Sequence, residues 1–144
     1  MNDRFVWGFV AGLLADIIKV GLNLFNFYIL HFTKLRYLDF TAILLIGHKP
    51  NLFIEAIIAQ FAELLWASLL GAAFAYLIAG MPKNLLFKSI IYGLCIWFFA
   101  HAVTTLFKVP YLTIMDWKTM AATSLSSVIY GFLLGFILKR FQKV

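Results

Sequence analysis

Three polar residues of one apolar segment are the first candidates for chemistry in this sequence. Asp16, Lys19 and Asn23 follow one another at spacings of three and four residues within the stretch 6–31. At about 100° per residue they share one side of a helix, in an arc of about 80°. The same arc contains three further small or polar residues: Gly8, Gly12 and Asn26. Lipid offers such side chains no hydrogen-bond partner, so this side must face protein or water.

Asp16 and Lys19 lie one helical turn apart and can form an ion pair. One interpretation is a structural pair; the other is a proton- or cation-binding carboxylate whose affinity the ammonium tunes. In a dry bundle, Lys19→Met and Asp16→Asn would each leave a lone buried charge and destabilise the protein, and the double variant would recover stability. On a hydrated path, water would screen the remaining charge and the single variants would fold almost normally. Asn23 and Asn26 extend the polar line and favour the hydrated path.

Two other apolar segments each carry an ionisable residue at depth. Glu63, in the stretch 52–79, is either a second proton site or a hydrogen-bond partner of Ser, Thr or Tyr on a neighbouring helix. His101, in the stretch 85–107, is either a hydrogen-bonded bundle residue or a haem ligand. The other two histidines lie near loops, which disfavours a two-histidine haem within one chain. A symmetric dimer that shares two copies of His101 stays open.

Composition identifies an integral membrane protein. Of its 144 residues, 64% are hydrophobic and 12% are charged, with a mean hydropathy of +0.96, whereas soluble domains are about half apolar and a quarter charged. The net charge of +6 comes from cations at the ends of apolar segments, where they meet anionic lipid head groups. No basic cluster interleaves with aromatic residues, so we expect membrane lipids and no nucleic acid as partners. A single cysteine, Cys95, excludes an intrachain disulfide and a multi-cysteine metal site.

Four apolar segments are long enough to cross a membrane as helices, which takes about 20 residues. They span about residues 6–31, 52–79, 85–107 and 117–138. Residues 37–46 form an apolar stretch of only ten residues, too short to cross, which predicts an interfacial or re-entrant helix. The sequence therefore predicts an all-α fold: a single transmembrane domain over residues 1–144, with a bundle of four spanning helices and one short non-spanning helix.

Rows of small residues at a spacing of four predict close helix contacts. One such row continues through Gly71 in the second span, and another through Gly131 in the fourth. We expect Gly71 and Gly131 to face neighbouring helices and not lipid. The full set of expected packing glycines is Gly8, Gly12, Gly71, Gly131 and Gly135.

Four spans place both termini on one side of the membrane. That side carries six cations, namely Arg4, Lys83, Lys88, Lys139, Arg140 and Lys143. The other side carries five, namely Lys34, Arg36, Lys49, Lys108 and Lys118. The small excess favours cytoplasmic termini in the cell membrane and leaves dual topology open.

Four short phrases of the chain are similar to those of a known group of proteins. They are Gly8-Phe-Val-Ala-Gly-Leu, Lys34-Leu-Arg-Tyr-Leu-Asp, Gly47-His-Lys-Pro-Asn and Phe107-Lys-Val-Pro. The chain resembles the YqhR-like group, small four-span membrane proteins of Gram-positive bacteria, over most of its length. The resemblance implies the four-span architecture and no particular chemistry.

The sequence contains no phosphate-binding loop, metal-ligand spacing or nucleophile elbow. We therefore expect no enzyme, no catalytic residue, no metal and no cofactor. The leading hypothesis is an oligomeric transporter or channel-like protein. Its ligand or ion path would contain Asp16, Lys19, Asn23, Glu63 and His101. The alternatives are a non-catalytic accessory or assembly subunit, whose small-residue rows bind partner membrane helices, and a haem-binding electron carrier.

Overall fold

The structure is a computed structural model that describes residues 3–78, 81 and 83–141, and that part of the chain forms helices and no strand. The helices are α1 (Arg4–Tyr28), α2 (Tyr37–Ile46), α3 (Phe53–Leu77), α4 (Leu85–Leu106) and α5 (Trp117–Phe141). Four of these are long and apolar enough to cross a membrane, and α2 is the short exception. The predicted all-α fold is confirmed, and the chain is a multi-pass membrane protein.

The ends of the helices follow local capping chemistry. The Asp3 carboxylate accepts hydrogen bonds from the backbone N–H groups of Phe5 and Val6, so α1 begins at Arg4 and not at the predicted residue 6. At α3 the Glu55 carboxylate accepts from the backbone N–H groups of Asn51 and Leu52. The far end of the predicted second span, residue 79, lies outside the described residues.

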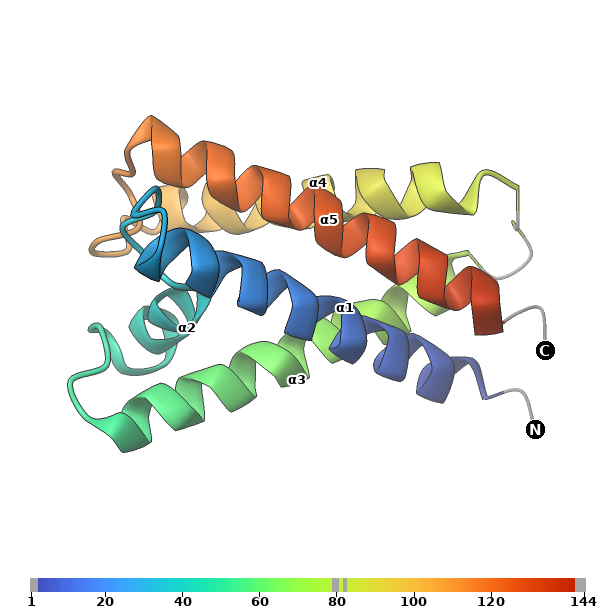
Figure 1. Ribbon diagram of the computed structural model, residues 1–144, viewed down its shortest axis with the longest axis horizontal. Coiled ribbons are helices and arrows are strands. Elements are labelled where there is room, and N and C mark those ends of the chain that lie inside the picture. The colour runs from blue at the N-terminus through green and yellow to red at the C-terminus, as the bar shows by residue number, and fades with distance from the viewer. Residues whose placement is uncertain (1–2, 79–80, 82, 142–144) are drawn as a thin grey trace.

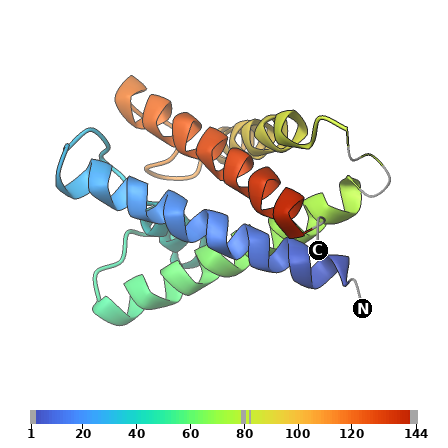
Figure 2. The same ribbon diagram turned by 45° about the vertical axis from the view of Figure 1, so that its right-hand side comes forward.

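α1 is the central helix of the bundle. It packs against α3 on one side and against α5 on the other, while α4 packs on α5 and α2 packs on α3. Figure 1 shows α1 between α3 and α5, and the turned view in Figure 2 keeps α4 beside α5. The start of α1 and the end of α5 lie at the same end of the bundle, where the rings of Trp7 and Phe141 are 4.5 Å apart. α2 lies at the opposite end.

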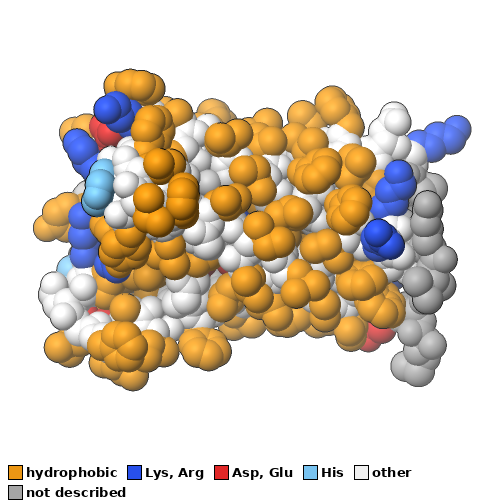
Figure 3. All heavy atoms as spheres, in the orientation of Figure 1, with side chains coloured by type: hydrophobic (Ala, Val, Ile, Leu, Met, Phe, Trp, Pro, Cys, Tyr) orange, Lys and Arg blue, Asp and Glu red, His pale blue; other side chains and the backbone are white. Residues whose placement is uncertain are grey.

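Hydrophobic side chains cover the middle of the molecule. Figure 3 shows them in a broad band, with Lys and Arg gathered at the two ends. Large apolar residues are extensively exposed, for example Phe53 at 83% and Phe99 at 70%. Such a band would be unfavourable in water but matches lipid chains, with the cations at head-group level.

Glycine brings α1 and α3 into backbone contact. A Cβ atom at Gly12 would lie 2.6 Å from the carbonyl oxygen of Ala67, and one at Gly71 would lie 2.7 Å from Gly12 Cα. A Cβ at Gly8 would meet Ala72 Cα at 2.7 Å. All three glycines therefore lie in the α1–α3 interface, where any side chain would force the helices apart.

α4 and α5 approach each other in the same way. A Cβ at Gly131 would lie 2.9 Å from Ile90 Cα, and one at Gly135 would lie 2.9 Å from Ser89 Cβ. Gly93 on α4 faces Gly131 in turn, since its Cβ would lie 3.3 Å from Gly131 Cα. Gly93 was not among the predicted packing glycines, although Ser89 and Gly93 repeat the spacing of four that marked the other rows.

Candidate functional site

Lys19 lies between two carboxylates at the crossing of α1 and α3. Its Nζ atom is 2.9 Å from Glu63 Oε1 on α3 and 2.5 Å from Asp16 Oδ1 on its own helix. Asp16 has no exposed surface and Lys19 is 8% exposed. We call Asp16, Lys19 and Glu63 the ion cluster. The close α1–α3 packing brings Glu63 to Lys19 across 44 residues of sequence.

Side chains from α2 and α5 complete the surroundings of the ion cluster. The Thr41 hydroxyl on α2 donates to Glu63 Oε2 over 2.7 Å. The Lys19 ammonium lies 4.1 Å from the ring centre of Tyr37 and 5.5 Å from that of Tyr130, within the range of cation–π attraction. Tyr130 is fixed because its hydroxyl donates to the Ala67 carbonyl oxygen over 2.7 Å. Four helices therefore contribute to this one site.

The ion cluster has more acidic than basic groups. Two carboxylates share a single ammonium, and no other cation forms an ion pair with them in the part of the chain that the structure describes. Asp16 Oδ2 is buried and has no hydrogen-bond partner among the described residues. A buried net negative charge is strongly unfavourable, so the cluster can hold one further positive charge, a proton or a monovalent cation.

Asn23 positions α2 and does not contact the carboxylates. Its Oδ1 atom accepts a hydrogen bond of 3.0 Å from the backbone N–H of Tyr37, the first residue of α2. Asn23 is 2% exposed, so its amide does not indicate water along the helix. The Asn23 amide therefore does not support a hydrated path, because its oxygen accepts from an N–H group at a helix N-terminus that has no partner within the helix.

Next to this contact, Arg36 and Asp39 tie the loop before α2 to the helix itself. The Arg36 guanidinium lies 2.9 Å from Asp39 Oδ1, and the Arg36 backbone N–H donates to Asp39 Oδ2 over 2.8 Å. Hydrogen bonding to Asp39 raises the pKa of Arg36 above its ordinary value. The start of α2 is thus fixed from both sides, which places Tyr37 and Thr41 against the ion cluster.

His101 is separate from the ion cluster. Its Nδ1 atom lies 3.2 Å from the Trp97 carbonyl oxygen, and its ring lies 4.7 Å from the Trp97 ring. Nε2 is buried with no hydrogen-bond partner in the described part of the chain. No hydrogen bond or ion pair connects His101 to the cluster across the described ranges. His31 and His48 are exposed in loops, so one chain offers His101 no second deep histidine.

Glu63, the third member of the ion cluster, changes the effect expected of the Asp16→Asn substitution. Because Glu63 shares Lys19, Asp16→Asn leaves a balanced pair and not a lone charge. The expectation that each single neutralisation of Asp16 or Lys19 leaves one unpaired charge is therefore wrong for Asp16. The expected hydrogen bond between Glu63 and a Ser, Thr or Tyr of a neighbouring helix is present, with Thr41 as the donor, but the sequence did not identify Tyr37, Thr41 or Tyr130 as the neighbours of the cluster. Tyr37 and Thr41 are four residues apart, so they lie on one face of a helix. The sequence does not show which other helix that face contacts.

Comparison with known protein families, with curated proteins and with solved structures finds no match. The similarity to the YqhR-like group therefore stays a prediction. Among the described residues, no group of three or more His, Cys, Asp or Glu side chains could hold a metal ion.

Proposed function

We propose that this protein is a small membrane transporter or channel-like protein whose ion cluster binds the transported or coupling ion, a proton. The observation that carries this proposal is the sharing of one ammonium by two carboxylates, of which Asp16 is fully buried and Glu63 is largely buried. A proton needs a single oxygen atom, and Asp16 Oδ2 is buried with no hydrogen-bond donor among the described residues. A metal cation needs several oxygen ligands, which favours the proton.

Proton binding at this site would change contacts in several helices. When Asp16 is protonated, Lys19 pairs with Glu63 alone; when the proton leaves, the two carboxylates compete for one ammonium. Glu63 also accepts the hydrogen bond from Thr41, so the competition extends to α2. This arrangement supports coupling between proton occupancy and the position of the short helix.

Proton flux through reconstituted vesicles tests the proposal. Vesicles with a trapped pH-sensitive dye and an imposed membrane potential should acidify faster with the protein than without it. Asp16→Asn and Glu63→Gln should each return the rate to that of protein-free vesicles. Glu55→Gln is the matched control, because it removes a carboxylate of α3 that lies outside the ion cluster. A wild-type rate equal to the protein-free rate, or full flux in Asp16→Asn, would contradict the proposal.

A second candidate function, an accessory subunit, draws support from α4. Only 11% of its most apolar stretch is buried, against 33% for α1 and α3 and 44% for α5. Its exposed residues include Phe87, Phe98 and Cys95, so a further copy of the chain or a partner subunit has a helix to pack on. An accessory role requires a larger complex, whereas a transporter of this size requires at most copies of itself.

Purification under mild conditions and cysteine oxidation distinguish a transporter made of copies of this chain from an accessory subunit. Cys95 is the only cysteine and is exposed on α4, so oxidation in native membranes should crosslink two copies if α4 forms a symmetric contact. Cys95→Ser should abolish the crosslink. A stable assembly with an unrelated protein would favour the accessory role. A coloured haem-containing preparation would favour the electron carrier, with two copies of His101 as the ligands.

A further inference from the structure

A cavity of about 400 Å³ opens at the end of the bundle that holds α2. Three connections form it: Lys34 and Leu35 come from the α1–α2 loop, Lys49 from the α2–α3 loop, and Tyr111 and Ile114 from the α4–α5 loop. It shares no residue with the ion cluster. Its volume falls in the range of about 300–1,000 Å³ that is typical of small-molecule sites.

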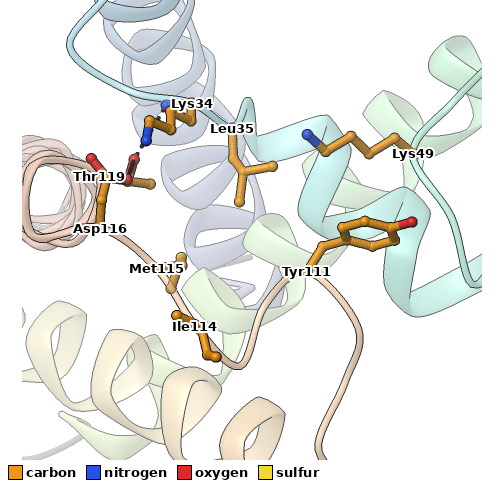
Figure 4. Close-up of a pocket in the computed structure, with 8 residues that line it drawn as sticks. All are labelled: Lys34, Leu35, Lys49, Tyr111, Ile114, Met115, Asp116 and Thr119. Atoms are coloured by element: carbon orange, nitrogen blue, oxygen red, sulfur yellow. Dashed lines mark hydrogen bonds between the residues drawn. The ribbon is translucent and has the colours of Figure 1, made fainter.

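Two ammonium groups flank this cavity. Figure 4 shows the Lys34 and Lys49 side chains on either side of Leu35. Neither lysine forms an ion pair within the ranges that the structure describes. The two lysines come from different loops and outnumber Asp116, the one carboxylate among the residues that line the cavity, so they leave a local positive potential that favours a ligand with a negative charge.

The acidic group of the cavity is already engaged. Asp116 Oδ1 accepts a hydrogen bond of 2.6 Å from the Thr119 hydroxyl. Thr119 Oγ1 in turn accepts a hydrogen bond of 3.2 Å from the Lys34 backbone N–H, which the dashed contact in Figure 4 marks. This chain of bonds fixes the Lys34 loop to the start of α5. These bonds hold one wall of the cavity, and they involve the Lys34 backbone and neither lysine ammonium group.

Apolar groups adjoin the positive charges on the outer side. Ile114 is 90% exposed and Tyr111 is 65% exposed, and both line the cavity. Trp117, 71% exposed at the start of α5, belongs to the same end of the molecule. Exposed aromatic residues beside cations are typical of the membrane–water interface. A soluble anion would gain nothing from an exposed isoleucine, whereas a lipid uses both kinds of contact.

We propose that this cavity binds the phosphate-bearing head group of an anionic phospholipid. The ammonium groups of Lys34 and Lys49 bind the phosphate oxygens, and the acyl chains leave over Ile114 toward the apolar band. A cavity of this volume holds the head group and not the whole lipid. Binding joins the three loops at this end of the bundle, so it should stabilise the fold.

Thermal unfolding in mixed micelles tests the lipid site. Phosphatidylglycerol should raise the Tm of the purified protein by about 5 °C at saturation, whereas phosphatidylcholine should have little effect. The double variant Lys34→Gln/Lys49→Gln should lose most of this rise, and Lys34→Arg/Lys49→Arg should keep it. Lys83→Gln is the matched control, because Lys83 comes just before α4, which begins at the end of the bundle opposite α2 (Figure 1), and its removal should leave the rise unchanged.

Three outcomes would overturn the lipid site. The first is equal stabilisation by phosphatidylcholine, and the second is an undiminished rise in the double glutamine variant. The third is a comparable rise with glycerol 3-phosphate alone, which would assign the cavity to a soluble phosphate compound. If the double glutamine variant fails to fold, Lys49→Gln alone decides, because the Lys49 side chain is exposed and forms no hydrogen bond or ion pair in the described structure. It should lose about half of the rise.

Discussion

Lys19 carries one positive charge and has two carboxylates within reach, which makes the three residues of the ion cluster unequal. Removing Asp16 or Glu63 leaves a neutral pair. Removing Lys19 takes away the one cation that pairs with Asp16 and Glu63 among the described residues, so a negative charge stays uncompensated even when one of the two carboxyl groups is protonated. If one cation balances two carboxyl groups, removing Lys19 should therefore destabilise the protein more than removing Asp16 or Glu63.

Lys19→Met should destabilise the protein by about 3–5 kcal/mol at neutral pH, because it leaves uncompensated buried charge. The loss should shrink as the pH falls, because protonation neutralises the two carboxylates. Asp16→Asn should cost much less, since Lys19 and Glu63 remain paired. Denaturation of the three proteins at two pH values measures this. Equal losses for both variants would show that Glu63 does not share the ammonium.

Asp116 gives a separate pH dependence at the start of α5. The hydrogen bond from the Thr119 hydroxyl, helped by the charge of Lys34, holds the pKa of Asp116 below its ordinary value. Its folded-state pKa is lower than that of the unfolded chain, so its stabilisation is present above the unfolded pKa, about 3.9, and is lost as the pH falls through the folded pKa. Asp116→Asn should remove this acid-side loss, so the Tm of the variant should depend less on pH below about 4. An unchanged Tm profile would show that Asp116 contributes nothing through its charge.

At the scale of helices, the α1–α3 crossing depends on backbone contact. Gly71→Leu should push the helices apart and destabilise the protein by about 1–3 kcal/mol. Gly21→Leu is the control, because a Cβ at Gly21 would meet nothing within 4 Å and so faces open space. Unfolding curves in detergent compare the two. The same loss in both variants would mean that the α1–α3 contact at Gly71 is not close.

The helices themselves could be predicted from the sequence because length and apolarity decide what can cross a membrane. The ten-residue stretch of α2 was too short for crossing, and spacing of small residues marked the rows that contain Gly71 and Gly131. These features are local, so one sequence contains them.

The neighbours of each helix could not be predicted in the same way. Whether Glu63 meets Lys19 depends on how α1 crosses α3, which two rows of small residues suggest but do not place in register. Asn23 looked like part of a polar path, because the sequence does not show that the first N–H of α2 lies beside it. Long-range pairing across 44 residues depends on three-dimensional packing.

At the scale of the whole molecule, the four long helices run up and down the bundle an even number of times, so the chain begins and ends at the same end. The start of α1 and the end of α5 lie together, and α2 lies at the other end (Figure 1). The exposed apolar band between the two charged ends has the distribution that a membrane requires (Figure 3). The lipid site and the ion cluster then lie at different depths of one bundle.

Reporter tags at the two termini should give the same accessibility, and we expect both on the cytoplasmic side because that end carries the small excess of cations. Protease protection in sealed membrane vesicles of known orientation measures this. A tag introduced after Lys49, in the α2–α3 loop, should show the opposite accessibility. Termini on opposite sides would mean an odd number of crossings and would contradict the four-span arrangement.

Infrared spectroscopy of the carboxyl groups tests the central claim most directly, because a protonated carboxylic acid has a carbonyl stretch that a carboxylate lacks. The chain has only six Asp and Glu residues, so the band of one protonated group can be assigned. At neutral pH the wild-type protein should show this band, and Asp16→Asn and Glu63→Gln should each remove it, while Glu55→Gln keeps it. A wild-type spectrum without the band at neutral pH, or a band that persists in both cluster variants, would show that the ion cluster does not hold the proton that its charge requires.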